Sequence, residues 1–223
     1  MPPDTSGFDF EVLEAASISA RHRESLIGLF QANYRDANPA FIDKSLSVLR
    51  HVAIARHEGE AIGFAMGESR RMDLPRLPDQ LVSLAGLSCI APEFRRRGLF
   101  GGLTMRAMAW NSSTDETRRL FCGRMAHPAA LRSITRLAKT VPSPGIRPTA
   151  WQQEVGKAIA DAYRVFDFDP ETFVCIGEGR PIGYPRIAFE VEPQEWEAFA
   201  CVNRDRGDAL LAIAWLPDSP SGW

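Results

Sequence analysis

The chain has 223 residues, of which 45% are hydrophobic and 24% are charged, with a formal net charge of −2 and a pI near 6.1. This length suits one domain with a sizeable core, and the charge balance gives no reason to expect nucleic acid or an anionic membrane as a partner. No apolar run approaches the length of a membrane span and no signal peptide precedes Phe8, so we expect a cytoplasmic protein.

The first half of the chain has apolar spacings that predict strands around two helices. Leu26, Ile27, Phe30 and Tyr34 recur at helical spacing, and Asn38 is placed to cap the second helix. The predicted elements are a strand at 8–13, helices at 20–34 and 41–49, a hairpin of strands at 52–56 and 61–67, and a long strand at 81–90. Prolines at 75 and 78 indicate a loop over residues 70–80.

The second half begins with a helix and a strand and becomes less regular. The predicted elements are a helix at 99–110, a loop at 111–116, a strand at 119–126, a helix that His127-Pro128 opens and that runs to about Lys139, a helix at 151–163, and strands at 173–176, 186–191 and 209–215. We expect a single domain over residues 1–223. An insertion at 140–185 is expected to act as a lid or as a wall for an acceptor.

The four cysteines are spread along the chain without a C-x-x-C pair. This spacing argues against a zinc ribbon or a redox dithiol, and we expect no metal. Each cysteine lies in an apolar context, so buried free thiols are expected at Cys89, Cys122, Cys175 and Cys201.

The stretch after the long strand is the most informative part of the sequence. Residues 90–102 read IAPEFRRRGLFGG, which places three arginines and then glycines at the expected start of a helix. Free N–H groups and the macrodipole favour an anion at a helix N-terminus, and glycine lets the backbone approach a phosphate. Arginines add charge-assisted phosphate contacts. The stretch therefore predicts a site for a pyrophosphate-bearing ligand, and the alternative is an Arg-rich surface turn.

The glycine spacing differs from the G-x-G-x-x-G dinucleotide fingerprint and from the P-loop. It resembles the acyl-CoA-binding motif of the GNAT (GCN5-related N-acetyltransferase) superfamily, Arg/Gln-x-x-Gly-x-Gly/Ala after a Pro-Glu-aromatic-Arg segment. Arg95 and Gly98 match this motif. Phe100 departs from it, because the family usually has Gly or Ala there, although Gly101 and Gly102 follow directly.

The order of predicted elements over about Phe8 to Lys139 is also that of the GNAT superfamily. The resemblance implies an α/β fold with a central, mostly antiparallel twisted sheet, a splayed parallel strand pair, and helices on both faces. The family closes its sheet with two further strands, for which 186–191 and 209–215 are the candidates.

The resemblance implies acetyl-CoA, or another acyl-CoA, as co-substrate. Its pantetheine arm would pair with the backbone at the end of the long strand, and its pyrophosphate would lie on the following turn. The residues expected to bind CoA are Ser88, Cys89, Ile90, Arg95, Arg96, Arg97, Gly98, Leu99, Phe100 and Gly101.

Acetyl transfer to an amine needs a base, a donor for the oxyanion and, in some enzymes, an acid for the leaving thiolate. The family often supplies that acid with a Tyr, but residues 128–149 contain none. The catalytic candidates are His127, preferred as the base, Glu68 acting through water, and Tyr163. His127 has the alternative role of a helix-entry residue, and Glu68 that of a solvated edge carboxylate.

Weaker candidates are Glu93, Ser133, Cys122 and an acyl-cysteine at Cys89. The sequence thus predicts an acyl-CoA-dependent acyltransferase, acting on a primary amine of a small polar molecule. O-acylation or other acyl-thioester chemistry on the same scaffold is one alternative, and a non-catalytic CoA-binding module is another. A homodimer is left open.

Overall fold

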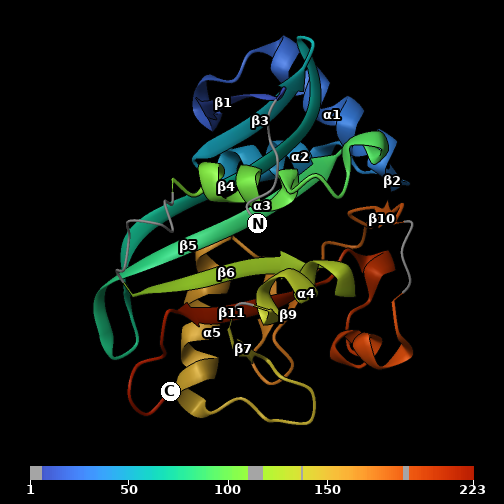
Figure 1. Cartoon of the computed structure of the whole chain (residues 1–223). Coiled ribbons are helices and arrows are strands. Elements are labelled where there is room, and N and C mark those ends of the chain that lie inside the picture. The colour runs from blue at the N-terminus through green and yellow to red at the C-terminus, as the bar shows by residue number, and fades with distance from the viewer. Residues whose placement is uncertain (1–6, 110–117, 137, 188–190) are drawn as a thin grey trace. The chain divides into compact units, whose positions relative to one another are not determined.

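Figure 1 shows the computed structural model, which describes residues 7–109, 118–136, 138–187 and 191–223. The chain forms two compact units. The first comprises the described residues of Met1–Ser69, Leu84–Asp115 and Gly183–Ile187, and the second those of Arg70–Ser83, Glu116–Ile182 and Ala188–Trp223. The strands β4 (Glu60–Leu74) and β5 (Leu77–Ile90) run through both units.

The first unit is a sheet in the order β1-β3-β4-β5 with three α-helices. Its other elements are β1 (Asp9–Glu14), η1 (Ala15–Ser17), α1 (Ala20–Asn33), β2 (Tyr34–Arg35), α2 (Ala40–Val48), β3 (His51–His57), η2 (Pro92–Phe94), α3 (Leu99–Ala107) and β10 (Tyr184–Pro185). β3 pairs antiparallel with both β1 and β4, and β10 forms a separate two-stranded sheet with β2. Along the chain, α3 follows β5 after the short helix η2.

The core of the first unit fixes the start of α3. Leu99, Leu103 and Ala107 form one buried stripe of that helix, and they pack against small side chains of β3 and β4 such as Ala53 and Ala65. Small residues let a helix lie close to a sheet, and α3 is seen in front of these strands in Figure 1. The buried Leu99 therefore holds the first turn of α3 in place.

The second unit is built around β11 (Ala209–Leu216), which is almost wholly buried. Its other elements are β6 (Arg119–Met125), α4 (Pro128–Thr135), β7 (Thr140–Val141), α5 (Ala150–Ala162), β8 (Asp167–Asp169), β9 (Val174–Ile176), η3 (Pro193–Phe199) and η4 (Arg204–Arg206). β11 pairs antiparallel with β6, β7 and β9, and β9 pairs with β8. β5 and β6 form a parallel pair in a sheet that is otherwise mostly antiparallel, which confirms the predicted fold class.

The predicted loop over residues 70–80 is wrong. β4 continues to Leu74 and β5 begins at Leu77, so a long hairpin replaces the loop. Its tip is held by polar contacts: the Asp79 N–H donates to Asp73 Oδ1 at 2.9 Å, and Arg71 donates to the Asp79 carbonyl at 2.8 Å. These contacts stabilise an extended conformation in a segment where the prolines suggested a loop.

Other boundaries also differ. The helix expected to reach Lys139 ends at Thr135, and the helix expected to reach residue 110 ends at Ala107. Of the expected strand at 186–191, residues 188–190 lie outside the described part and the described remainder forms no strand, whereas the expected strand at 209–215 is observed as β11. The expected loop at 111–116 also lies outside the described residues. Cys201 is exposed, whereas the other three thiols are buried as predicted.

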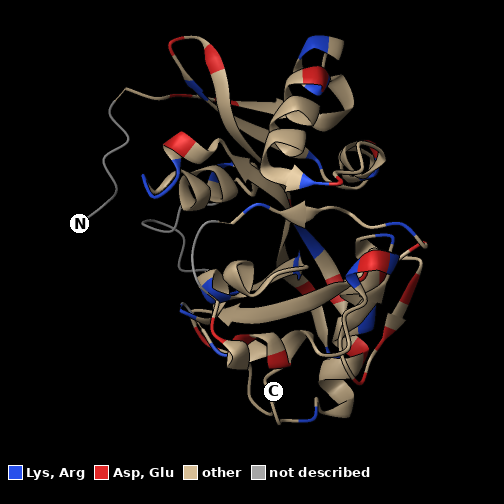
Figure 2. Ribbon diagram, turned by 90° about the vertical axis from the view of Figure 1, so that its right-hand side faces the viewer, with Lys and Arg blue, Asp and Glu red and all other residues tan. Residues whose placement is uncertain are grey.

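Basic and acidic residues are interspersed along the ribbon (Figure 2). Within the described part of the chain, none of the helices combines the length and apolar character that a membrane span requires.

Candidate functional site

The main chain between β5 and α3 has the shape of an anion-binding turn. The pairing with β4 ends at Ala91, whose N–H donates to the Ile62 carbonyl at 2.8 Å. Two residues of the turn then take the left-handed conformation, Arg96 with φ of 65° and Gly98 with φ of 76°. Backbone N–H groups around such residues form concave sites for anions. Because Gly98 is also the N-cap of α3, the turn leads directly into the positive end of that helix.

The first turn of α3 leaves space for a ligand. Its first intrahelical bond runs from the Gly102 N–H to the Gly98 carbonyl, and the N–H groups before it have no acceptor within a helix. Phe100 is 43% exposed, and a Cβ placed on Gly101 would meet nothing within 4 Å. Phe100 therefore points away from the core, and the departure from the family motif leaves the backbone accessible.

Arg95 makes three hydrogen bonds within the first unit. Its guanidinium donates to the Ile90 carbonyl at 3.2 Å, to Asn33 Oδ1 at 2.6 Å and to the Arg186 carbonyl at 2.8 Å. The side chain thus ties the end of β5 to the end of α1. It holds the turn from inside the first unit.

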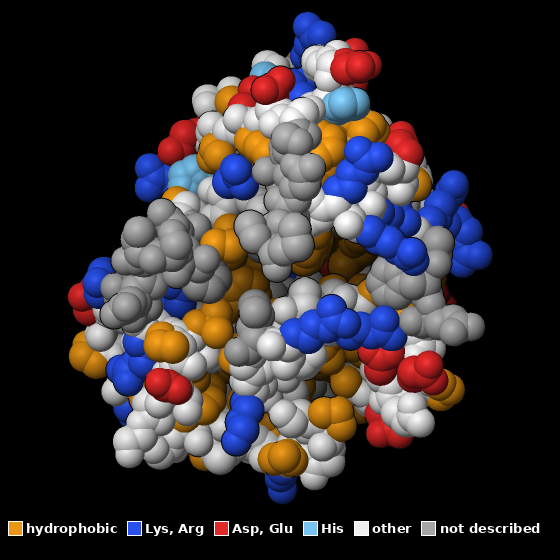
Figure 3. All heavy atoms as spheres, in the orientation of Figure 1, with side chains coloured by type: hydrophobic (Ala, Val, Ile, Leu, Met, Phe, Trp, Pro, Cys, Tyr) orange, Lys and Arg blue, Asp and Glu red, His pale blue; other side chains and the backbone are white. Residues whose placement is uncertain are grey.

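Arg96 and Arg97, the other two arginines of the turn, are exposed. The Arg97 guanidinium lies 5.4 Å from the ring centroid of Phe94 and 6.0 Å from that of Phe8, within the range of a cation–π contact. Several basic side chains are visible on the face of the molecule that Figure 3 shows.

Ser88, Cys89 and Ile90 form the end of β5, and the thiol of Cys89 is buried there. Cys89 is 3% exposed, and burial raises the pKa of its thiol well above the usual range, with Arg95 opposing the shift. A neutral buried thiol is a poor nucleophile, so an acyl-cysteine at Cys89 has no support here. Ser88 is half-buried, and the Ile90 carbonyl already accepts from Arg95.

Glu68 lies within β4, and its side chain is 6% exposed, so the expected solvated edge carboxylate is wrong. Its neighbour Gly67 lies beside Leu84 of β5, because a Cβ on Gly67 would be 3.1 Å from the Leu84 carbonyl oxygen. From Leu84 to Ile90 a strand rises about 20 Å. Glu68 is therefore a buried carboxylate of the first unit, well back along β5 from the turn.

His127 belongs to the second unit, where it is the N-cap of α4. Its Nδ1 accepts from the Ala129 N–H at 3.2 Å, and its ring packs edge-on against Trp196. Burial, then the nearby Arg204 and Arg132, lower the pKa of His127 to about 4. This environment does not suit the base expected at His127, because a neutral imidazole with a pKa near 4 whose Nδ1 caps a helix is a weak base.

Tyr163 also belongs to the second unit and is 3% exposed. Its hydroxyl donates to the Cys122 carbonyl of β6 at 2.9 Å, which fastens the end of α5 to the sheet. This contact gives Tyr163 a structural role. The weaker candidates are placed similarly: Ser133 donates to Ala130 within α4, Cys122 is buried, and Glu93 is exposed on η2.

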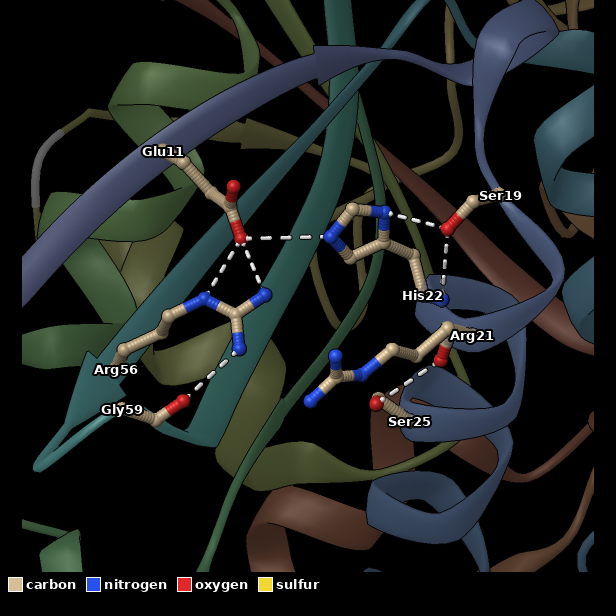
Figure 4. A network of polar contacts seen from close by, with 7 residues as sticks. All are labelled: Glu11, Ser19, Arg21, His22, Ser25, Arg56 and Gly59. Carbon is tan, nitrogen blue, oxygen red and sulfur yellow. Dashed lines mark hydrogen bonds and ion pairs between the residues drawn. The ribbon is translucent and has the colours of Figure 1, made fainter.

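A further polar cluster of the first unit has the order of a Ser-His-Glu triad (Figure 4). Ser19 Oγ is 2.9 Å from His22 Nδ1, and His22 Nε2 is 3.8 Å from Glu11 Oε1. However, Arg56 binds the same Glu11 oxygen at 2.6 Å, and Ser19 Oγ accepts from the His22 N–H as the cap of α1. The cluster therefore stabilises the start of a helix. Across the described residues, no group of three or more His, Cys, Asp or Glu is arranged to hold a metal ion.

No protein-family model matches the chain, and no curated protein matches it in sequence. Solved structures do match. An aminoglycoside N-acetyltransferase AAC(6')-Iy in complex with CoA is 18% identical with a TM-score of 0.41, covering 59% of this chain and 87% of its own. Diaminobutyrate acetyltransferase EctA from Paenibacillus lautus, in complex with its substrate and coenzyme A, is 14% identical with a TM-score of 0.41, covering 96% and 98%. The ribosomal-protein-S18-alanine N-acetyltransferase from Escherichia coli is 9% identical with a TM-score of 0.44, covering 96% and 99%.

The architecture itself gives the assignment. The described elements follow the order strand, two helices, hairpin, long strand, turn, helix, strand, helix, and β5 and β6 form the parallel pair. The turn that carries Arg95 and Gly98 lies between β5 and α3, where the motif requires it. The fold therefore agrees with the one that the resemblance to the GNAT superfamily implies.

Proposed function

We propose that this protein is an acyl-CoA-dependent acyltransferase that moves the acetyl group of acetyl-CoA to a primary amine of a small polar molecule. One observation carries the proposal: left-handed residues at Arg96 and Gly98 shape an anion-binding turn at the N-terminus of α3. A CoA thioester presents a pyrophosphate that suits this turn. It also presents an extended arm that suits strand addition along β5.

The residues of the turn have different roles in binding the pyrophosphate. The N–H groups at the start of α3 donate to the pyrophosphate, and the exposed Arg96 and Arg97 add charge-assisted contacts. Arg95 holds the turn through the hydrogen bonds that its guanidinium donates to three oxygens. Acetyl-CoA supplies the acyl group as a thioester, and the chain supplies binding, orientation and proton transfer.

The proton to be removed is on the acceptor amine. A primary amine with an ordinary pKa of about 10.4 is protonated at pH 7 and must lose its proton before it attacks. Glu68 is the base that we propose, acting through water, because it is a carboxylate of the same unit as the turn. His127 is disfavoured because its pKa lies near 4, and Tyr163 is buried against Cys122. The CoA thiolate, with a pKa near 8.5, departs without a full acid.

A turnover assay tests the proposal. Purified protein is incubated with acetyl-CoA and either a panel of amines, including diamines, amino acids and amino sugars, or a panel of hydroxyl compounds without an amine, and free thiol release is followed. At least one amine is expected to accelerate thiol release above the rate of hydrolysis, with a matching acetylated product by mass spectrometry. Release that follows hydroxyl compounds alone would establish O-acylation instead. Binding of acetyl-CoA without any turnover would establish a non-catalytic module.

A further inference from the structure

A five-residue segment, Gly183–Ile187, belongs to the first unit although the residues on either side of it belong to the second. We call this segment the strap. Within it, β10 pairs with β2, and the Arg186 N–H donates to the Asn33 carbonyl at 2.8 Å. Gly183 has φ of 139°, and a Cβ there would lie 3.1 Å from Ala37 Cα, so only glycine fits. The strap is therefore seated closely on the end of α1.

Asn33 is the last residue of α1, is 4% exposed, and uses each of its polar groups. Its Nδ2 donates to the Leu29 carbonyl at 2.8 Å, and its Oδ1 accepts from Arg95 Nη2 at 2.6 Å. Its main-chain carbonyl accepts from the Arg186 N–H. A buried amide satisfied in this way holds its partners in one geometry.

Arg95 joins this amide to the turn. Its planar guanidinium reaches Asn33, the Arg186 carbonyl of the strap and the Ile90 carbonyl at the end of β5. The next residue, Arg96, is already left-handed. The Arg95 side chain thus fixes the point at which the turn leaves β5. Its shortest hydrogen bond is the one to Asn33.

We propose that Asn33 is a positioning residue for the acyl-CoA site, acting through Arg95, and that the strap is part of the support of the turn. The inference rests on the proposed function, because the ligand is the acyl-CoA of that proposal. The physical reason is preorganisation: a turn held in its binding conformation before the ligand arrives loses less freedom on binding. Removing the Asn33 acceptor frees one arm of the guanidinium, so the turn samples other conformations.

Two variants separate this role from a general effect on folding. Asn33→Leu and Asn33→Asp both lose the donor to the Leu29 carbonyl, so both are expected to lower the thermal midpoint. Only Asn33→Asp keeps an oxygen for Arg95. Calorimetric titration with acetyl-CoA should therefore show about tenfold weaker binding for Asn33→Leu and an affinity within about threefold of wild type for Asn33→Asp.

Equal affinity in all three proteins, or equal losses in the two variants, would overturn the inference. If wild type itself does not bind acetyl-CoA, the proposed function fails instead, and the two failures are thereby distinguished. If Asn33→Leu folds poorly, Asn33→Ser replaces it in this titration. A second comparison uses double variants. In an Arg95→Ala background, removing the amide should cause no further loss of affinity, because the residue through which it acts is gone. Additive losses would contradict the proposal.

Discussion

Replacing Glu68 with glutamine is expected to lower turnover by about 10²–10⁴-fold while acetyl-CoA binding stays within about threefold of wild type. Glutamine has nearly the same shape as glutamate, so it fits the buried position, but it cannot accept a proton from the amine. The measurement is steady-state thiol release with the best amine of the panel, together with calorimetric binding of acetyl-CoA. A Glu68→Gln variant with full turnover would remove Glu68 from the mechanism.

Two control variants sharpen this result. Glu60→Gln removes an exposed carboxylate from the start of the same strand and should leave turnover unchanged. His127→Asn removes the imidazole but keeps a side chain that caps helices well. Because the pKa of His127 is lowered to about 4, the residue is neutral in the folded protein throughout pH 6–9, and His127→Asn should leave both the rate and its pH profile in that range unchanged. A loss confined to His127→Asn would make His127 the base.

Replacing Gly177 with alanine is expected to destabilise the second unit by about 3 kcal/mol, the upper end of the usual cost of overpacking. A Cβ on Gly177 would lie 2.1 Å from the Arg206 carbonyl oxygen and 2.4 Å from the Gly207 carbonyl carbon, and both are main-chain atoms. These atoms are held in place, because the Arg206 carbonyl accepts from the Gly179 N–H at 3.1 Å and the Asp208 carboxylate accepts from the Gly177 N–H at 2.8 Å. The segment therefore has little freedom to move aside.

Thermal unfolding measures this effect. A loss of about 3 kcal/mol corresponds to a fall in Tm of about 6–12 °C for a chain of this size. Gly179→Ala is the matched control: Gly179 has φ of 87° but open space around it, so only backbone strain of about 1–2 kcal/mol is expected. Equal falls in Tm for the two variants would show that the close approach at Gly177 does not matter.

The sequence predicted the fold where local periodicity and glycine positions determine the secondary structure. The prediction was wrong where contacts between side chains far apart in the sequence determine it. The hairpin at residues 70–80 was hidden by Pro75 and Pro78, which suggest a loop. The structure stabilises that hairpin through Asp73 and Asp79, and Trp151 Nε1 donates to the Pro75 carbonyl at 2.7 Å from 76 residues away. No local pattern reports a partner at that separation.

Some features of the candidate site could be predicted from the sequence, and others required the structure. Gly98 could be placed from the motif, and its left-handed φ is what glycine permits at such a turn. The role of Arg95 could not, because its partners Asn33 and Arg186 are 62 and 91 residues away. The low pKa of His127 likewise depends on burial and on arginines brought close only by folding. Residue type predicted the chemistry of the turn, while the burial and partners of each side chain required the structure.

Whether the turn before α3 binds the pyrophosphate of acetyl-CoA can be measured in one calorimetric titration. Acetyl-CoA is titrated into wild type, Gly98→Ala and Gly59→Ala. Gly98 and Gly59 have φ of 76° and 84° and belong to the same unit, so alanine introduces similar backbone strain at each, but only Gly98 lies on the turn. We predict that wild type and Gly59→Ala bind with equal affinity and that Gly98→Ala binds at least about tenfold more weakly. Alanine disfavours the left-handed conformation at residue 98, so the turn loses at least one charge-assisted contact to the pyrophosphate, and such a contact contributes about 1.5–3 kcal/mol. Absence of binding by wild type, or unchanged affinity in Gly98→Ala, would contradict the account.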